Sequence, residues 1–388
     1  MLSVSPFTPT IEHGEKGKSR NVIICCDGTN NEFNRKNVTN VMKFFNLLDD
    51  IDPESQISYY SPGVGTIGGF KWIKSAFGWG IEEDIRNMYK YLMDRYRNGD
   101  KIFLLGFSRG AYSVRGLAGL INKCGLLQKG NDNLIRYALD MYWDKNNLTE
   151  ADMFKDAFSR SIETYFVGVW DSVSSYFPYP KSHVFSDNIL RHSVRFGYQA
   201  LAIDELRVDF NAELWKNEII NLPDVDIKRK HENIYDPNSD QEEFPMIEQV
   251  WFAGVHCNIG GLYDEEGLSN ICLKWMINKG LQHNLIFKKN RKQDFTSNSV
   301  NPPDRIISTD EIPEFNGGDY RDKVIDSSAG LWIMRPKRRR KIPENSRIHE
   351  SVIKRMLFAD VNYHPKNLPK KYVVVNDKGE IVGTESNH

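Results

Sequence analysis

The 388-residue chain lacks a long hydrophobic run, and no stretch approaches the about 18 consecutive apolar residues of a membrane-spanning helix. It also lacks an excess of charge of one sign, because 51 basic and 52 acidic residues leave a formal net charge of −1. This balance excludes a surface that is basic all over, so we expect no nucleic-acid partner. The first twenty residues have no apolar segment behind a basic start, and we expect no ordinary secretory signal.

Cysteine is scarce and has no framework spacing. The five cysteines are Cys25, Cys26, Cys124, Cys257 and Cys272. Their number is odd and no Cys-x-x-Cys pair occurs, which disfavours a disulfide framework and a zinc site. We expect synthesis in the cytoplasm, with delivery elsewhere by a specialised secretion system left open. We expect no cofactor: the Gly-x-Gly-x-x-Gly pattern at 63–68 has no clear helix start after it and no acidic residue at a later strand end.

Apolar segments of two kinds alternate along the chain, whose 40% hydrophobic residues are typical of a globular protein. Near-continuous apolar runs predict strands at 21–27, 56–62, 101–105, 164–171 and 248–256. Helical spacing predicts helices at 37–48, 81–96, 111–127, 193–206 and 268–282. Strands that are apolar on both sides are typical of a mostly parallel central sheet with helices on both faces. We therefore predict an α/β fold, α/β-hydrolase-like, with long loop insertions.

The domain organisation follows from where this alternation stops. Residues 1–20 are expected to form a polar lead-in, 21–370 a single domain and 371–388 a C-terminal tail. Polar segments without periodicity predict insertions at about 172–192, 207–247 and 285–345. Long insertions of this kind are often lids or binding loops.

The pattern Gly-Phe-Ser-Arg-Gly at 106–110 lies between an expected strand and an expected helix. A Gly-x-Ser-x-Gly turn in that context is typical of a nucleophile elbow, in which larger flanking residues would clash with the strand or the helix. Ser108 Oγ would point into a crevice near the positive end of the helix dipole. We predict that Ser108 is a nucleophile; a tight turn with a capping serine is the alternative.

A serine nucleophile needs a base that takes its proton. Of the nine histidines, His256 alone directly follows a strong expected strand and precedes a further turn. His349 and His364 lie in a polar C-terminal region without an expected strand. We predict that His256 is the general base, with a histidine satisfied within its loop as the alternative.

The base in turn needs a carboxylate that fixes its tautomer. Asp171 ends the expected strand 164–171 and lies between Ser108 and His256 in the chain, which is the order found in α/β-hydrolases. Asp204 is the rival, but it falls inside an expected helix, where an ion pair with an arginine suits it better. We predict that Asp171 is the acid.

An acyl-transfer site also needs backbone donors for the oxyanion. The N–H of Arg109 follows the nucleophile, and the loop after the first strand offers Gly28 and Thr29 as the second source. Asn30 could add a side-chain donor. Asp27 is expected to form or orient this loop; a metal role for it has no second cluster to support it.

Six cations occur within the seven residues Arg335 to Lys341. A solvated loop is one reading of this basic run. The other is a peripheral contact with an anionic membrane or with lipid headgroups.

Five motifs in order resemble the α/β-hydrolase family long catalogued as a domain of unknown function, which includes type VI secretion lipase effectors of the phospholipase A type. They are Cys-Asp-Gly-Thr-Asn-Asn from 26, the elbow from 106, Val-Gly-Val-Trp-Asp-Ser-Val from 167, Ala-Leu-Ala-Ile-Asp-Glu from 200 and Val-Trp-Phe-Ala-Gly-Val-His from 250. The resemblance spans about residues 20 to 370. It implies Ser108 as nucleophile, Asp171 as acid and His256 as base.

The chain departs from the family after the histidine. The family usually shows Ser-Asp-Val-Gly-Gly-Gly there, whereas this chain has Cys-Asn-Ile-Gly-Gly-Leu at 257–262. Asn258 stands in place of a carboxylate, and we expect it to support His256.

These observations favour a serine hydrolase that cleaves carboxylic esters through an acyl-enzyme, with lipid or phospholipid esters as substrates. A hydrolase-fold binding module without turnover is one alternative. A phosphoester or nucleotide hydrolase that uses the basic run is the other.

Overall fold

The computed structural model of the protein describes residues 19–28, 38–63, 72–144, 148–173, 194–215, 246–288, 318–325, 327 and 336–386, with only the backbone at 72–79 and 385–386. The expected insertions at 172–192, 207–247 and 285–345 lie largely outside these residues, as does the Gly-rich pattern after Gly63. Within the described part, no helix is both long and apolar enough to cross a membrane.

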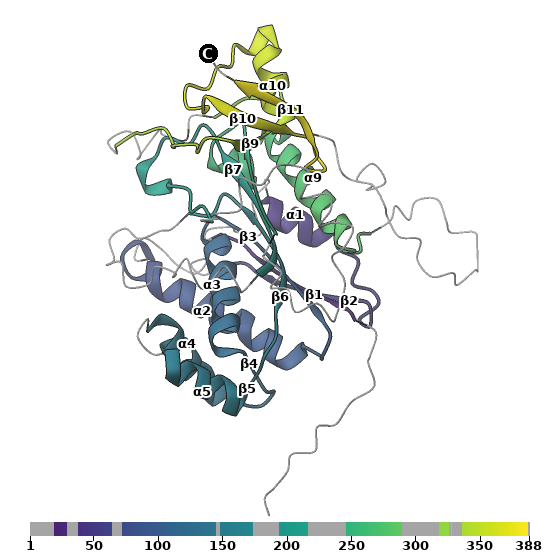
Figure 1. Cartoon of the computed structure of the whole chain (residues 1–388), viewed down its shortest axis with the longest axis vertical. Coiled ribbons are helices and arrows are strands. Elements are labelled where there is room, and N and C mark those ends of the chain that lie inside the picture. Colours follow the sequence, from purple (N-terminus) through teal and green to yellow (C-terminus); the bar gives the residue numbers. More distant parts are fainter. Residues whose placement is uncertain are drawn as a thin grey trace, which may run out of the picture.

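A nine-stranded sheet forms the centre of the molecule, in the order β11-β10-β9-β8-β7-β6-β3-β1-β2 (Figure 1). Its strands are β1 (Asn21–Cys26), β2 (Gln56–Ser61), β3 (Lys101–Phe107), β6 (Thr164–Trp170), β7 (Val194–Ala202), β8 (Met246–Phe252), β9 (Ser346–His349), β10 (Lys371–Val375) and β11 (Ile381–Ser386). All neighbouring strands pair in parallel except β10 and β11. The predicted mostly parallel sheet is confirmed. The carboxyl ends of the parallel strands therefore lie at one edge of the sheet, where side chains that follow different strands can meet.

Helices cover both faces of this sheet. One face carries α2 (Trp72–Arg95), α3 (Arg109–Cys124), α4 (Ile135–Trp143) and α5 (Leu148–Phe158), and the other carries α1 (Asn40–Leu47) and α9 (Gly267–Gln282). Shorter elements are α8 (His256–Gly260), α10 (Glu350–Leu357), η1 (Asp132–Leu134), η3 (Val208–Phe210), η8 (Ala359–Val361) and the strand pair β4 (Leu126–Leu127) and β5 (Ser159–Arg160). Alternate side chains of β1 enter the two cores: Val22 and Ile24 pack on the α2–α5 side, Ile23 and Cys25 on the α1–α9 side.

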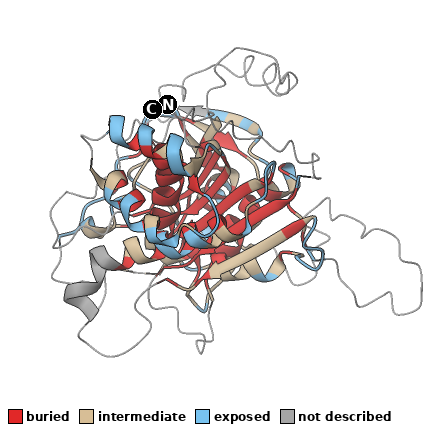
Figure 2. Cartoon of the chain, turned by 90° about the horizontal axis from the view of Figure 1, so that it is seen from below, coloured by how far each residue is buried: buried red, intermediate tan, exposed pale blue. Residues whose placement is uncertain are grey.

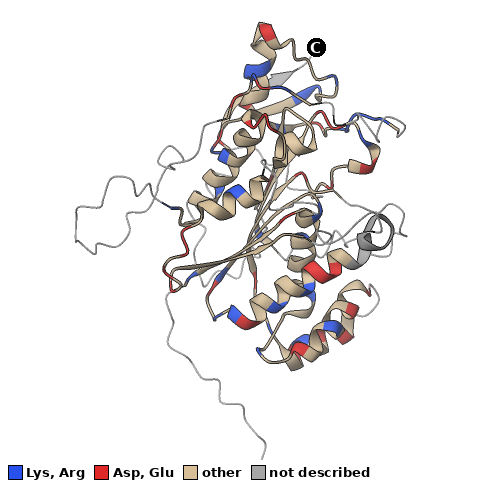
Figure 3. Cartoon of the chain, turned by 180° about the vertical axis from the view of Figure 1, so that it is seen from behind, with Lys and Arg blue, Asp and Glu red and all other residues tan. Residues whose placement is uncertain are grey.

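Burial and charge follow these layers. The central strands β1, β3, β6 and β7 are buried along most of their length, whereas the outer faces of the helices are exposed (Figure 2). Basic and acidic residues are interspersed over the helices (Figure 3). A third apolar cluster lies where α10 packs against β8, β9 and β10.

One predicted helix is wrong. Within the range 193–206, residues Val194–Ala202 form the central strand β7, paired in parallel with β6 and β8. Val194, Phe196 and Tyr198 alternate with Arg195 and Gly197, a period of two that the helical interpretation passed over. A second boundary also differs, because the helix expected at 111–127 begins at 109 and ends before the positive-φ glycine at 125.

The expected C-terminal tail is also wrong, because residues 371–386 supply β10 and β11 of the sheet. The turn between them contains Gly379 at φ 82°, which a glycine adopts readily. His349 ends β9, against the expectation that no strand precedes it. These strands are short, so their apolar patterns are weak, and they gain stability by pairing with an existing sheet edge.

Candidate active site

Ser108 lies on a sharp turn between β3 and α3. Its backbone has φ 57° and ψ −120°, a conformation that residues with a side chain rarely adopt. A Cβ atom on Gly106 would lie 2.6 Å from the carbonyl oxygen of Gly110, and one on Gly110 would lie 2.2 Å from that of Cys26. Only glycine fits at either position, and this steric requirement produces the Gly-x-Ser-x-Gly pattern. The side chain of Ser108 is half-buried at the carboxyl edge of the sheet.

His256 is the first residue of α8, four residues after the end of β8. Its Nε2 lies 2.8 Å from Ser108 Oγ. The imidazole is 3% exposed and packs between two rings, with centroid distances of 4.7 Å to Phe107 and 5.0 Å to Phe210. The short helix packs so closely on Phe107 that a Cβ on Gly260 would lie 2.0 Å from that ring.

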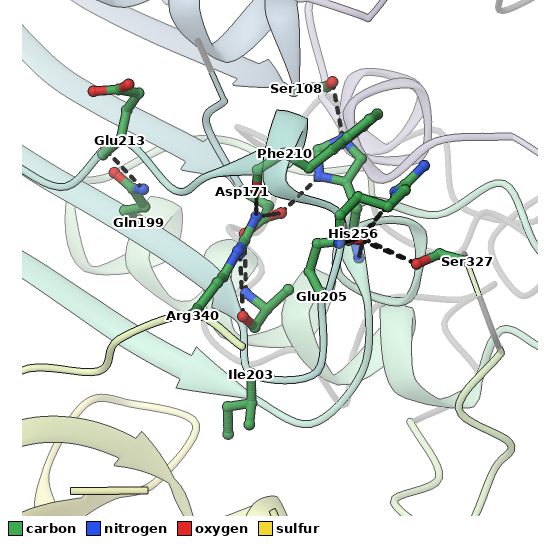
Figure 4. Close-up of polar contacts among 12 residues, drawn as sticks. Ser108, Asp171, Gln199, Ile203, Glu205, Phe210, Glu213, His256, Ser327 and Arg340 are labelled. Carbon is green, nitrogen blue, oxygen red and sulfur yellow. Dashed lines mark hydrogen bonds and ion pairs between the residues drawn. The ribbon is translucent and has the colours of Figure 1, made fainter. Parts of the chain in front are cut away.

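Asp171 follows β6 directly and is fully buried, with φ 42°. Its Oδ2 lies 2.6 Å from His256 Nδ1, and its Oδ1 accepts a hydrogen bond of 2.9 Å from Ala202 N. When Nδ1 carries the proton and donates it to Asp171, Nε2 is an acceptor that faces the Ser108 hydroxyl (Figure 4). The fold thus brings together the three residues that the sequence singles out, from the ends of three strands, in a geometry that can pass a proton from serine to histidine.

Arg340 meets the same aspartate, which the sequence did not indicate. Its Nη1 donates to Asp171 Oδ1 at 2.5 Å and its Nη2 to Oδ2 at 2.9 Å. Burial by itself raises the pKa of Asp171, but the charges of Arg340 and His256 outweigh it and hold that pKa well below its ordinary value. The carboxylate is therefore charged around pH 7.

The basic run is thus not a uniform surface, and the expectation for Arg335 to Lys341 needs correction. Arg340 is buried, whereas the other described cations are exposed: Lys337, Arg338, Arg339 and Lys341. Arg335 lies outside the described residues. The segment runs antiparallel to 206–208, since Arg338 N donates to Leu206 O at 2.8 Å. This pairing holds the run beside η3, whose Phe210 packs on His256.

Glu205 also holds His256, whereas the sequence drew attention to its neighbour Asp204. Its Oε2 accepts a hydrogen bond from His256 N at 3.2 Å, and its carboxylate pairs with Arg207 at 2.8 Å. Burial opposes its ionisation, but Arg207 holds the pKa of Glu205 below its ordinary value. A glutamate two residues before an arginine was the available signal in the sequence.

Asp204 does not lie in a helix and takes a different role from the expected ion pair. It follows β7 and accepts hydrogen bonds from Gly254 N at 2.7 Å and Tyr363 Oη at 2.8 Å. Burial raises its pKa above the ordinary value. It fixes the loop between β8 and His256. Asn258 acts nearby, since its Oδ1 accepts a hydrogen bond from Val255 N at 3.2 Å at the start of α8.

The expected oxyanion donors are only partly described. Arg109 N opens α3 next to the serine, and a Cβ on Gly28 would lie 3.4 Å from Ser108 Cβ, so this loop closely approaches the elbow. Gly28 N itself donates to Asp27 Oδ1 at 2.8 Å. Thr29 and Asn30 lie outside the described residues.

Asp27 organises the loop that carries Gly28. It is buried and accepts hydrogen bonds from Thr39 Oγ1 and, at 2.8 Å, from Tyr60 Oη. No group of three or more His, Cys, Asp or Glu side chains suited to a metal ion occurs among the described residues. The contacts of Asp27 fit the expected loop-orienting role.

A family model described as "T6SS, Phospholipase effector Tle1-like, catalytic domain" matches residues 20–279. Over 190 residues the chain is 36% identical to "Uncharacterized protein YEL023C" of Saccharomyces cerevisiae, which covers 42% of this chain and 28% of that protein. An uncharacterized protein from Pseudomonas aeruginosa is a structural neighbour, with 15% identity and a TM-score of 0.43 over 68% of this chain and 46% of that chain. The Tle1 effector bound to the VgrG spike from the Type 6 secretion system is another, with 18% identity and a TM-score of 0.32 over 63% and 51%. The chain thus spans between 28% and 51% of the lengths of these proteins.

Proposed function

Because the chain belongs to the family of T6SS Tle1-like phospholipase effector catalytic domains, we propose that it is a serine hydrolase that cleaves the carboxylic esters of lipids, phospholipids foremost. Ser108 is the nucleophile of this proposal, His256 the general base and Asp171 the acid that orients it. The observation that carries the proposal is the continuous hydrogen-bonded relay of 2.8 Å and 2.6 Å between these side chains, at an elbow whose glycines admit no side chain.

The proposed reaction has two halves. In the first, Ser108 Oγ attacks the ester carbonyl while its proton moves to His256 Nε2, and the tetrahedral oxyanion is stabilised by backbone donors that include Arg109 N. The imidazolium then gives the proton to the leaving alcohol, which leaves an acyl-serine. In the second half, water attacks the acyl carbon and its proton passes to Nε2. Collapse of the intermediate returns that proton to Ser108 Oγ and releases the fatty acid.

A fluorophosphonate probe and a series of phospholipid esters test this proposal together. The wild-type protein is expected to take up one probe at Ser108 and to hydrolyse esters, and Ser108→Ala to lose both. Ser113→Ala is the matched control, because Ser113 is a buried serine in α3, the helix that follows Ser108. Folded wild-type protein that neither reacts with the probe nor hydrolyses any ester would favour the binding module, and release of phosphate from a nucleotide or phosphomonoester would favour the phosphoester hydrolase.

We further propose that the exposed cations contact anionic lipid headgroups. Lys337, Arg338, Arg339 and Lys341 are exposed on a short segment held beside η3 and the relay. Each cation near an anionic membrane surface contributes about 1 kcal/mol of attraction. Such a contact would bring the carboxyl edge of the sheet to the lipid.

A further inference from the structure

The guanidinium of Arg340 is held in a single orientation by four hydrogen bonds. Nη1 donates to Asp171 Oδ1 at 2.5 Å and to Ala202 O at 3.1 Å. Nη2 donates to Asp171 Oδ2 at 2.9 Å and to Phe210 O at 2.5 Å. Every Nη–H is used, and each carboxylate oxygen of Asp171 receives one of them. The side chain is 4% exposed.

We propose that Arg340 is a positioning residue of the hydrolytic relay, which fixes the Asp171 carboxylate against His256 and keeps that carboxylate charged. This role rests on the serine hydrolase activity proposed above. The hydrogen bonds of Arg340 reach Asp171, Ala202 O and Phe210 O, so it acts on the relay through Asp171.

The orientation part of this role follows from geometry. A planar guanidinium that donates to both oxygens of a carboxylate fixes the plane of that carboxylate, which a lysine cannot do. Asp171 Oδ2 is shared between Nη2 and His256 Nδ1, so the plane of the carboxylate determines where the imidazole points. The same guanidinium holds Phe210 O, and the Phe210 ring packs on His256. Arg340 thus supports the imidazole on two sides.

The pH part follows from charge. Asp171 is fully buried, and burial favours the neutral form of a carboxyl group. The positive charge of Arg340 opposes this effect and lowers the pKa of Asp171. Without Arg340, the carboxylate would bind a proton at higher pH. A neutral Asp171 would no longer hold His256 through a charged hydrogen bond, so the relay would be inactive over more of the acidic range.

Few other described groups compete for control of this pair. Glu205 lies at His256 N, and its charge is balanced by Arg207. The thiols of Cys257 and Cys272 also interact electrostatically with Asp171. Burial raises the pKa of Cys257 to about 11 and that of Cys272 well above its ordinary value. Both thiols stay neutral around pH 7. Arg340 is therefore the one cation in this described set that contacts Asp171 directly.

The test compares Arg340→Gln and Arg340→Lys in the full-length protein, by pH profiles of kcat/KM on a water-soluble short-chain ester. Arg20→Gln is the matched control, because Arg20 is also buried, also pairs with a buried aspartate (Nε to Asp100 Oδ2, 3.0 Å) and also donates to backbone carbonyls. Arg20 precedes β1 and Asp100 precedes β3, so this pair lies at the opposite edge of the parallel sheet.

Arg340→Gln is expected to lower kcat/KM at pH 7 by about 100-fold and to move the acidic limb of the profile upward by about one pH unit. Arg340→Lys is expected to keep the acidic limb of the profile near its wild-type position, because the positive charge remains. It is expected to lose about 10-fold in kcat, because an ammonium group lacks the planar pair of donors that holds both carboxylate oxygens. Arg20→Gln is expected to lower the melting temperature without moving the limb.

A glutamine variant that is folded and keeps the wild-type profile overturns the proposal. If the glutamine variant does not fold, the lysine variant decides, since wild-type kcat in Arg340→Lys also overturns the orienting role. These outcomes are read against active wild-type enzyme. Failure of the serine hydrolase proposal appears separately, as wild-type protein without esterase activity or probe labelling.

Discussion

Ser108 and Asp171 both lie in the left-handed region of backbone conformation, which costs residues other than glycine about 1–3 kcal/mol each. Backbone hydrogen bonds that continue the sheet hold them there: Ser108 N donates to Trp170 O at 3.1 Å, and Asp171 N to Ala200 O at 2.7 Å. Two residues of the relay therefore occupy strained positions that their neighbouring strands impose. This backbone conformation directs the side chains of Ser108 and Asp171 toward His256 at the carboxyl edge of the sheet.

This strain predicts that Ser108→Gly is more stable than the wild type. Glycine adopts φ 57° without a Cβ penalty, so we expect the free energy of unfolding to rise by about 1 kcal/mol while hydrolysis is lost. Ser108→Ala is the control, since it loses the hydroxyl but keeps the Cβ and the strain. Denaturant unfolding of the three proteins measures the difference. Equal stability of the glycine and alanine variants would show that the turn is not strained.

At the scale of elements, the five-residue helix α8 positions His256. Its first residue is His256, and Asn258 accepts from Val255 N where the helix begins. Its last residue, Gly260, lies against Phe107, the residue before Ser108. Helix and elbow thus share one packing contact. We expect the distance between His256 Nε2 and Ser108 Oγ to depend on that contact.

Gly260→Ala tests this dependence. Alanine favours a helix over glycine by about 1 kcal/mol, yet its Cβ would lie 2.0 Å from the Phe107 ring. We expect the displaced helix to lower kcat/KM by about 100-fold. Gly383→Ala, in β11, is the control, because a Cβ at Gly383 would lie 3.9 Å from the nearest atom, Val374 Cβ, which is an ordinary contact. Unchanged activity in Gly260→Ala would mean that the contact does not set the position of His256.

The elements themselves were predictable to different degrees. Long, strongly patterned segments such as β1, β3 and α9 lie where their sequences predict them. β7 lies where the sequence predicts a helix, because Gln-Ala-Leu-Ala at its end suits both periods. β10 and β11 lie where the sequence predicts a tail, because each is short and their stability comes from pairing with each other and with β9 rather than from their own residues.

At the scale of the whole molecule, the net charge of −1 conceals a local excess. Lys337, Arg338, Arg339 and Lys341 are exposed within five residues of chain, and Arg340 between them is turned inward to Asp171. The same segment thus presents cations outward and a positioning residue inward. Attraction to an anionic surface would act on the segment that carries Arg340.

Reversal of charge at Lys337 and Arg338 tests the headgroup contact. We expect Lys337→Glu/Arg338→Glu to weaken binding to vesicles containing anionic phospholipid by about 10- to 30-fold, and wild-type binding to weaken as salt is raised. Lys129→Glu/Arg136→Glu is the control, because it changes net charge equally at two exposed positions on the α4 side. Sedimentation with vesicles measures both. Equal losses in the two variants would assign the effect to net charge rather than to this segment.

The sequence by itself determined the parallel α/β architecture and the chain order of Ser108, Asp171 and His256, because apolar strands, an elbow with obligatory glycines and strand-end polar residues are local patterns. The tertiary structure alone decided that Arg340 is buried on Asp171 and that Glu205 holds His256 N. The run from Arg335 to Lys341 reads as a solvated loop in the sequence, and nothing in that sequence shows which of its cations is buried. Which one is buried depends on where a buried carboxylate more than 150 residues away in the chain needs a counter-charge.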